Sequence, residues 1–237
     1  MSLPFPAINE SSSPEEVWTT AFQELGQRIR HHFVRQEPHH RALSYVRGLM
    51  SEISRKNGWQ VAEEVGEATP YAMQHLLDRA RWDCDGVRDE LRTSISQALA
   101  DPHGVLVIDE TGFLKKGRHS AGVARQYSGT AGRVENCQIG VFLTYASAQG
   151  HVLLDRELYL PQAWTNDTER CTGAGIPPER SFATKPQLAR QMLERAFDAA
   201  VPDAWVAGDS VYGDNRQLRA WLEERAQAYV LTVSGKA

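Results

Sequence analysis

The sequence has 237 residues, of which 41% are hydrophobic and 24% are charged, so it can form one sizeable core plus a small accessory domain. Its formal net charge of -4 argues against a protein that coats nucleic acid nonspecifically, because such binding depends on neutralising phosphates with Lys and Arg. The sequence contains neither an apolar stretch of membrane-spanning length nor a secretory signal, which predicts a cytoplasmic protein without a membrane partner.

The N-terminal part of the sequence, residues 1–14, is polar and rich in Pro and Ser, and we expect it to be a disordered tail. A helix is predicted to follow directly, because Ser13 can cap it, a proline fits its first turn and Glu16 can complete a capping box. Apolar residues at helical spacing carry this helix to about Val34, and Pro38 prevents it from continuing.

Four histidines lie near the end of this helix. They could suggest a metal site, but adjacent pairs in an Arg-rich stretch are more typical of a solvated or phosphate-facing surface. We therefore predict such a surface for His31, His32, His39 and His40.

The stretch up to residue 103 contains further helical patterns and few strand signals, so residues 15–103 are predicted to form an all-α domain that binds DNA. The expected helices are 42–53, 59–65, 70–81 and 87–99.

Residues 61–77 have the layout of a helix-turn-helix. Ala62 is small enough for a close helix crossing, Gly66 suits the turn, and Thr69 can cap the second helix. The alternative is a plain helical bundle, since any two short helices joined by a glycine look similar. If the unit binds DNA, the side chains that the second helix turns outward are Gln74, His75 and Arg79.

From Gly104 onward the pattern changes to strands separated by two helices. Strands are expected at 105–109, 137–146, 151–160, 204–209 and 228–233. One helix begins after Thr184, and another is capped by Asp214 or Asn215. The order of three strands, a helix, a strand, a helix and a strand predicts an α/β fold with a ribonuclease-H-like mixed sheet over residues 104–237. In that arrangement the fourth strand returns to lie beside the first.

Two short apolar runs each end in a carboxylate, at Asp109 and at Asp209. If the first and fourth strands are neighbours, these two side chains meet at one edge of the sheet and can share divalent cations. Phosphodiester cleavage by two metal ions requires such bridging carboxylates.

Other roles for these residues are possible. An aspartate at the end of a buried strand often caps the next helix. The run Val107–Glu110 also looks like the magnesium-binding strand of a nucleotide-hydrolysing motor, but residues 1–104 contain no Gly-rich phosphate loop ending in Lys-Ser or Lys-Thr.

The segment between Thr111 and Arg133 contains no acidic residue and directly follows the first carboxylate. Such a basic segment predicts contacts to DNA phosphates, with a merely solvated loop as the alternative. Its basic side chains are Lys115, Lys116, Arg118, Arg125 and Arg133.

Several segments together resemble bacterial insertion-sequence transposases of the DDE type, specifically the insertion-sequence 701 family. The most specific run begins with Val-Ile-Asp-Glu-Thr-Gly at Val107 and extends to Gly140. The other segments that carry the resemblance are 155–161, 182–186, 204–209, 212–213, 55–60 and 79–82.

This resemblance implies that Asp109 and Asp209 are the first two metal-binding acids of a DDE triad, with Mg²⁺ or Mn²⁺ as cofactor. The implied reaction is cleavage at transposon ends followed by strand transfer into target double-stranded DNA, by a self-associating protein in the bacterial nucleoid. The third acid, a Glu, is expected on a helix well beyond the fifth strand, whereas the printed sequence ends at Ala237. We therefore expect an incomplete core that lacks its final helix, and neither Glu223 nor Glu224 lies on the right element to replace that acid.

A noncatalytic function is the alternative. A DNA-binding fragment that uses its helical domain and basic segment could occupy transposon ends, or pair with an intact transposase, and so repress or modulate it.

Overall fold

A computed structural model of the protein describes residues 13–235, except for the side chains of residues 95–97. Most of the predicted disordered tail, residues 1–14, lies outside the described residues. The chain divides into two compact units between Ser94 and Ile95, and each unit is treated by itself below.

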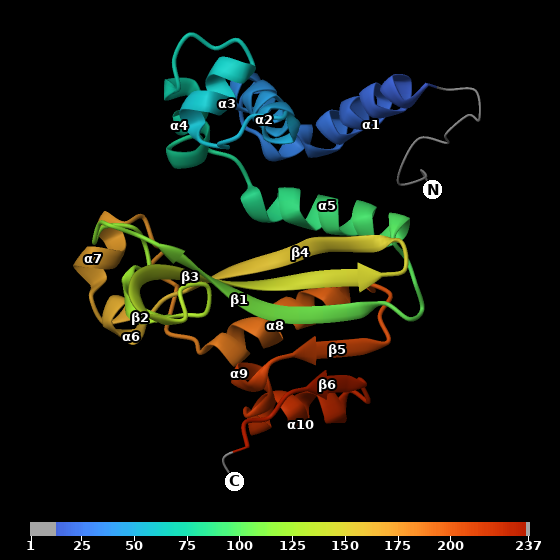
Figure 1. The fold of residues 1–237 in the computed structure, drawn as a ribbon, viewed down its shortest axis with the longest axis vertical. Helices are drawn as coiled ribbons and strands as arrows, with labels where there is room; N and C mark the ends of the chain where they lie inside the picture. The colour runs from blue at the N-terminus through green and yellow to red at the C-terminus, as the bar shows by residue number, and fades with distance from the viewer. Residues whose placement is uncertain (1–12, 236–237) are drawn as a thin grey trace. The chain divides into compact units, whose positions relative to one another are not determined.

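The first unit is helical, as predicted, and its α-helices are labelled in Figure 1. The helices of this unit are α1 (Pro14–Ile29), the short 3₁₀ helix η1 (Arg30–His32), α2 (Gln36–Met50), α3 (Gly58–Glu64), α4 (Tyr71–Asp78) and α5 (Cys84–Ala98), whose last residues belong to the second unit. The capping box at the start of α1 is confirmed, because Ser13 accepts a hydrogen bond from the Glu16 amide and Glu16 accepts one from the Ser13 amide.

Two of the predicted helix limits near Pro38 are wrong. The first helix ends at Ile29, not at Val34, and the next begins at Gln36, not at Ala42. Pro38 therefore lies in the first turn of α2, where its missing N–H would have had no helical acceptor. Pro38 therefore marks the first turn of α2 and does not lie in a break between the two helices.

The histidine surface predicted near α1 is only partly correct. His39 is buried, with one ring nitrogen 2.7 Å from the carbonyl oxygen of Gly26, and its ring packs edge-on against Phe33. The side chain of His32 is only 13% exposed, whereas His31 and His40 are exposed. Sequence adjacency hides this difference, because neighbouring residues on a helix point in different directions.

Helices α3 and α4 pack through buried Ala62 and Met73. Gly66 occupies the left-handed region (φ +80°) in the turn between them, as expected of the glycine predicted at this turn. The predicted cap by Thr69 is wrong, because α4 begins after Pro70 and no side chain caps it. Whether the pair acts as a helix-turn-helix stays a prediction.

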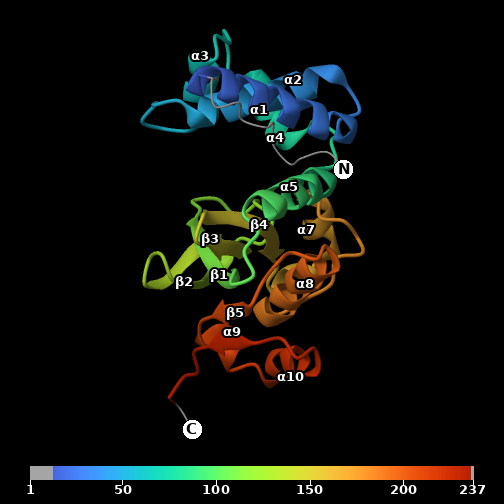
Figure 2. The ribbon, with the colours of Figure 1, turned by 90° about the vertical axis from the view of Figure 1, so that its right-hand side faces the viewer.

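The second unit is built on one mixed sheet (Figures 1 and 2). Its strands are β1 (Val105–Leu114), β2 (Ala124–Ser128), β3 (Arg133–Ser147), β4 (Gly150–Tyr159), β5 (Trp205–Gly208) and β6 (Tyr229–Leu231). Strands β4, β3 and β1 pair antiparallel, β5 lies parallel to β1, and β6 lies parallel to β5. This is the ribonuclease-H-like strand arrangement that the element order predicted, with the short β2 added beside the start of β3.

Five helices follow the hairpin of β3 and β4 or connect the later strands. They are α6 (Gln162–Thr165), α7 (Thr168–Gly173), α8 (Lys185–Asp198), α9 (Ser210–Gly213) and α10 (Arg216–Glu224). No helix was predicted between the strand expected at 151–160 and the helix after Thr184, so α6 and α7 were missed. The two helices are four and six residues long, too short for hydrophobic periodicity to reveal them.

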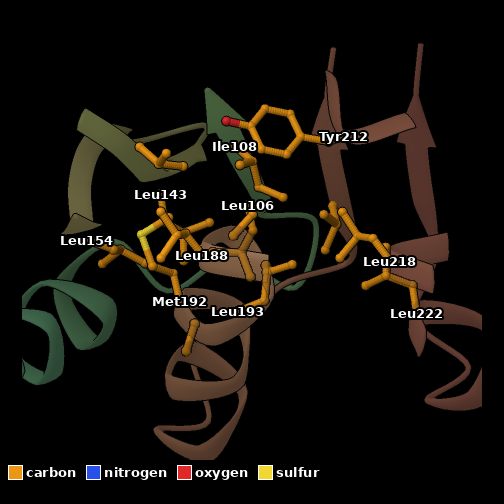
Figure 3. Close-up of a cluster of buried hydrophobic side chains, with 14 of the residues drawn as sticks. Leu106, Ile108, Leu143, Leu154, Leu188, Met192, Leu193, Tyr212, Leu218 and Leu222 are labelled. Atoms are coloured by element: carbon orange, nitrogen blue, oxygen red, sulfur yellow. The ribbon is translucent and has the colours of Figure 1, made fainter. Parts of the chain in front are cut away.

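The core of this unit lies between the sheet and α8 (Figure 3). Leu106 and Ile108 of β1 face Leu193 of α8, and α10 joins the same cluster through buried leucines. Trp221 of α10 stacks on Phe197 of α8 with ring centroids 5.8 Å apart, so both helices cover one face of the sheet. Burial of this layer fixes the strand register.

No helix within residues 13–235 combines the length and the apolar character needed to cross a bilayer.

Candidate active site

The two aspartates singled out by the sequence lie at the same edge of the sheet. Strands β1 and β5 are parallel neighbours, and Ile108 is the partner of Gly208 in their register. Asp109 is the next residue on β1, and Asp209 directly follows the end of β5, so the topology brings together two positions that are distant in the sequence. Strand β5 ends here, whereas β1 continues to Leu114 beside β3.

Asp209 caps the helix that follows it. Its Oδ1 accepts a hydrogen bond of 2.9 Å from the Val211 amide at the start of α9, so the capping role considered for such residues is real. Burial raises the pKa of the Asp209 carboxyl group above its usual range, the Val211 hydrogen bond opposes that shift, and repulsion from Glu110 and Asp109 adds to it. An acid held in this way is stabilised by a bound cation.

Asp109 is exposed, and its Oδ1 accepts a hydrogen bond of 2.7 Å from the amide of the next residue. Side chains alternate along a strand, so Asp109 projects from the face of β1 opposite to Ile108 and Glu110. Within residues 13–235, neither Asp109 nor Asp209 forms an ion pair with a Lys or Arg.

Glu110 is the residue of this site that the sequence reasoning missed. Its Oε1 lies 2.6 Å from Nζ of Lys185 at the start of α8, and its Oε2 accepts a hydrogen bond of 2.7 Å from the hydroxyl group of Tyr212 in α9. Burial raises the pKa of Tyr212, and its contact with the Glu110 carboxylate raises it further, so this hydroxyl group stays a donor. The Glu110 carboxylate therefore connects β1 to α8 and α9, the helices that precede and follow β5 in the chain.

Signals for this network were present in the sequence. Lys185 and Tyr212 lie inside segments that carry the family resemblance, although no role had been assigned to them. Only glycine fits at position 213, because a side chain there would collide with the carbonyl oxygen of Thr232, which follows β6. The Tyr-Gly pair thus allows α9 to sit against the end of β6 while Tyr212 reaches Glu110.

The basic segment after Asp109 is more ordered than a loop. Strand β1 continues into it, and β2, which was not predicted, pairs with the first residues of β3. Lys115 donates its backbone amide to Asn136 on one edge of β3, and Arg125 is the register partner of Asn136 on the other edge. The structure therefore brings these two basic residues to opposite sides of one strand. We call residues 115–136 the basic extension.

The loop within the basic extension is held by α6 and α7. Trp164 donates its indole N–H to the carbonyl oxygen of Val123 at 2.8 Å, and Arg170 stacks over the Trp164 ring at 3.7 Å. Arg170 also donates a hydrogen bond of 3.2 Å to the carbonyl oxygen of Arg118. This bond holds the backbone of Arg118, whose side chain is exposed. The exposed basic side chains of the extension are Lys116, Arg118, Arg125 and Arg133, whereas Lys115 is half-buried.

Arg133 differs from the others because its Nε lies 2.7 Å from Glu135. That pair partly neutralises the Arg133 guanidinium within the protein.

The three residues predicted to face outward from α4 are exposed: Gln74, His75 and Arg79. His75 and Arg79 border a groove of about 650 Å³ in the helical unit. The other basic residues along this groove are Arg35, Arg41 and Arg81. The predicted contact helix therefore lies beside a basic groove.

Comparison with known proteins gives the family of the chain. A family model described as DDE superfamily endonuclease matches residues 25–237. A probable transposase for insertion sequence element IS701 of Microchaete diplosiphon is 27% identical over 187 residues, which cover 78% of this chain and 46% of that protein. The chain thus spans about half the length of this curated relative.

Among solved structures, a Mos1 transposase paired-end complex with left transposon end matches 97% of this chain and 70% of its own chain, at 15% identity and a TM-score of 0.29. This overlap is too weak to establish a shared fold.

Proposed function

The chain belongs to the DDE superfamily endonuclease family, and from that premise we propose that it is a transposase that cuts the ends of an insertion sequence and joins them to target DNA. The observation that carries the proposal is the register of β1 and β5, which puts Asp109 and Asp209 at adjacent strand positions. Residues 104–237 would be the catalytic core, and residues 15–103 the DNA-binding domain.

Asp109 and Asp209 are the proposed ligands of Mg²⁺ or Mn²⁺. Their oxygen donors suit these hard cations. Burial raises the pKa of Asp209, repulsion from Glu110 and Asp109 raises it further, and a bound cation would offset both effects. When bound, such ions supply an activated water and stabilise the leaving oxygen of the phosphodiester. Glu110 acts as a positioning residue that holds β1 against α8 and α9 through Lys185 and Tyr212. No described residue is proposed as the third acid.

The DNA contacts proposed for the core are the basic side chains of the extension. We call the end of the sheet that carries Asp109 and Asp209 the acidic edge. The side chains that would bind phosphates next to it are Lys115, Lys116, Arg118 and Arg125, with Arg133 contributing less. A second contact is proposed on α4, where the helix-turn-helix would present its outward residues to transposon-end DNA. Self-association on paired ends and a cytoplasmic location at the bacterial nucleoid belong to the same proposal.

Metal-dependent nicking of transposon-end DNA tests the catalytic assignment. Because no described residue supplies a third acid, we expect at most weak nicking of this DNA by residues 1–237 with Mg²⁺ or Mn²⁺. Asp109→Asn and Asp209→Asn should abolish any such nicking while DNA binding persists. Glu194→Gln is the matched control, since this carboxylate is paired on the outer surface of α8 and should leave nicking unchanged. Nicking that survives both aspartate changes would refute the assignment.

The noncatalytic alternative predicts a different pattern. A repressor fragment would bind transposon ends without nicking them, and would keep its affinity after Asp109→Ala. The basic extension allows either function, because phosphate contacts serve a binder and a catalyst equally.

Salt dependence of DNA binding tests the basic extension. Replacing one phosphate-binding residue should lower the slope of log affinity against log salt by about 1. We expect this for Lys116→Ala and Arg125→Ala, and a smaller change for Arg133→Ala because of its pair with Glu135. Unchanged slopes in all three would mean that the extension is only solvated.

A further inference from the structure

Three potential metal ligands converge in the helical unit. His31 and His32 lie on η1, Glu90 lies on α5, and one ligand atom from each lies within 4.8 Å of the others. The two imidazole rings have centroids 3.9 Å apart. Among the residues that the structure describes, this is the one group of three or more His, Cys, Asp or Glu side chains with such spacing.

The surroundings of His32 are those of a metal ligand. Its Nδ1 lies 3.6 Å from Oδ2 of Asp83, while its Nε2 is buried and has no hydrogen-bond partner among the described residues. Histidines that bind metals commonly direct their second ring nitrogen toward a carboxylate, which fixes the tautomer and orients the ring. Asp83 supplies that carboxylate, so the unsatisfied Nε2 is the nitrogen left for a ligand.

The backbone leaves space for this ring. A side chain at Gly86 would collide with the His32 imidazole and with the Asp83 carboxylate. The Gly86 amide also donates to Oδ1 of Asp83 at 2.8 Å, which holds the carboxylate toward the ring. The start of α5 thus forms a cradle for His32.

Nearby positive charges are neutralised by other acids. Arg88 pairs with Asp85 and Asp89, at 3.0 and 2.8 Å, and Arg92 pairs with Asp89 at 2.9 Å. Glu90 belongs to none of these pairs, so its carboxylate is available to the histidines opposite it.

We propose that His31, His32 and Glu90 bind a divalent transition metal of the Zn²⁺ class. Two imidazoles and one carboxylate are a common protein ligand set for Zn²⁺, with water in the fourth position. Imidazole nitrogen favours such ions over Mg²⁺, which prefers oxygen ligands. The site would connect the end of α1 to α5 and so stabilise the helical unit, and it does not depend on the proposed function of the acidic edge.

Titration of Zn²⁺ into the metal-free full chain, in competition with a chromogenic chelator, tests this proposal. We expect the wild type to bind one more equivalent than His31→Ala and Glu90→Gln, whose affinity at this site should fall by at least about 100-fold. His40→Ala is the matched control: it removes an exposed histidine of the same unit outside the cluster and should bind like the wild type.

A further variant tests whether the Asp83 carboxylate orients the His32 ring. Asp83→Asn keeps the oxygen that accepts the Gly86 amide but removes the carboxylate beside His32. We expect Zn²⁺ affinity to fall by about 10- to 100-fold, the range for losing an outer carboxylate of a metal site.

The thermal midpoint gives a second readout. Zn²⁺ should raise it in the wild type, in His40→Ala and in Asp109→Asn, but not in Glu90→Gln, because a ligand stabilises only the state that binds it. Circular dichroism of the metal-free variants checks that each is folded. Equal Zn²⁺ stoichiometry and affinity in Glu90→Gln, His31→Ala and wild type would overturn the proposal, as would a wild type that binds none. Persistent binding in Asp109→Asn keeps this result separate from the nicking assay.

Discussion

Two groups of carboxylates on the same sheet have opposite surroundings. Asp155 and Glu157 on β4 face Arg195 of α8, with contacts of 2.8 Å from its guanidinium to each, and Arg180 lies 3.2 Å from Glu157. At the edge formed by β1 and β5, Asp109 and Asp209 have no such partner within residues 13–235, and the neighbouring Glu110 is paired with Lys185.

The pKa shifts of Arg195 and Asp209 reflect the charges that surround each group. Burial alone would lower the pKa of Arg195, but its hydrogen bonds and charge interactions with Asp155 and Glu157 outweigh burial and raise it. Burial raises the pKa of Asp209, and the adjacent acids raise it further. The first group therefore stabilises the fold, whereas the second retains uncompensated negative charge, which is the condition for binding a metal ion.

The largest expected effect comes from removing the compensating charge of the first group. Arg195→Met should lower the free energy of unfolding by about 3–5 kcal/mol, because it removes a guanidinium that lies 2.8 Å from each of two buried carboxylates, whereas the contact of Arg156 with Asp155 is longer, at 3.7 Å. The Asp155 side chain is 0% exposed, so solvent screens this carboxylate poorly. Urea denaturation followed by circular dichroism measures this loss.

Glu194→Gln on the same helix is the control for charge alone. Its pair with Arg190 spans one turn on the surface of α8, and its loss should cost less than about 0.5 kcal/mol. If the two variants lost similar stability, the distinction between compensated and uncompensated carboxylates would have no energetic basis.

The second prediction concerns the hydroxyl group that holds Glu110. Tyr212 is fully buried and donates to the carboxylate at 2.7 Å, so Tyr212→Phe should lower the free energy of unfolding by about 1.5–3 kcal/mol. Tyr229→Phe is the matched control, since Tyr229 makes a similar hydrogen bond of 2.6 Å to the exposed Glu223 and its loss should be close to neutral. A neutral Tyr212→Phe would mean that Lys185 alone positions Glu110.

The sequence allowed the paired aspartates to be predicted, because strand periodicity and element order are local signals. Apolar runs of strand length ended at Asp109 and Asp209, and the ribonuclease-H-like order made those runs neighbours. The starts of two helices were equally visible. Ser13 was predicted to begin a capping box and Thr184 to precede a helix, and both residues cap the helices that follow them.

The partners of the carboxylates could not be predicted, because they depend on packing between elements far apart in the chain. Glu110 and Tyr212 are 102 positions apart, and Asp155 and Arg195 are 40 apart. The sequence shows only that acids and bases are present, and the fold decides which of them meet. The short β2 was missed for the same reason, since it is a strand only because it pairs with β3.

Asp203 is intermediate between the two groups and gives a pH prediction. It is half-buried and accepts one neutral hydrogen bond of 2.8 Å from Gln227, and burial raises its pKa to about 6. The folded protein then holds this proton more tightly than the unfolded chain, so its contribution to stability falls as pH rises from about 4 to 6. Asp203→Asn should raise stability at pH 7 by on the order of 1 kcal/mol, after allowing for solvent screening, and flatten this part of the profile. An unchanged pH profile would mean that solvent already compensates this carboxylate.

The smallest expected effect is the most informative about the acidic edge. Asp209→Asn keeps an oxygen for the Val211 amide, so the cap of α9 survives, while the repulsion from Glu110 and Asp109 is removed. Because the folded-state pKa of Asp209 is raised, its ionised form destabilises the protein at neutral pH, and the variant should be more stable by less than about 1 kcal/mol. Added Mg²⁺ should stabilise the wild type in urea denaturation but not Asp209→Asn. A variant that is less stable than the wild type, with an unchanged response to Mg²⁺, would mean that Asp209 serves the helix cap and not a cation.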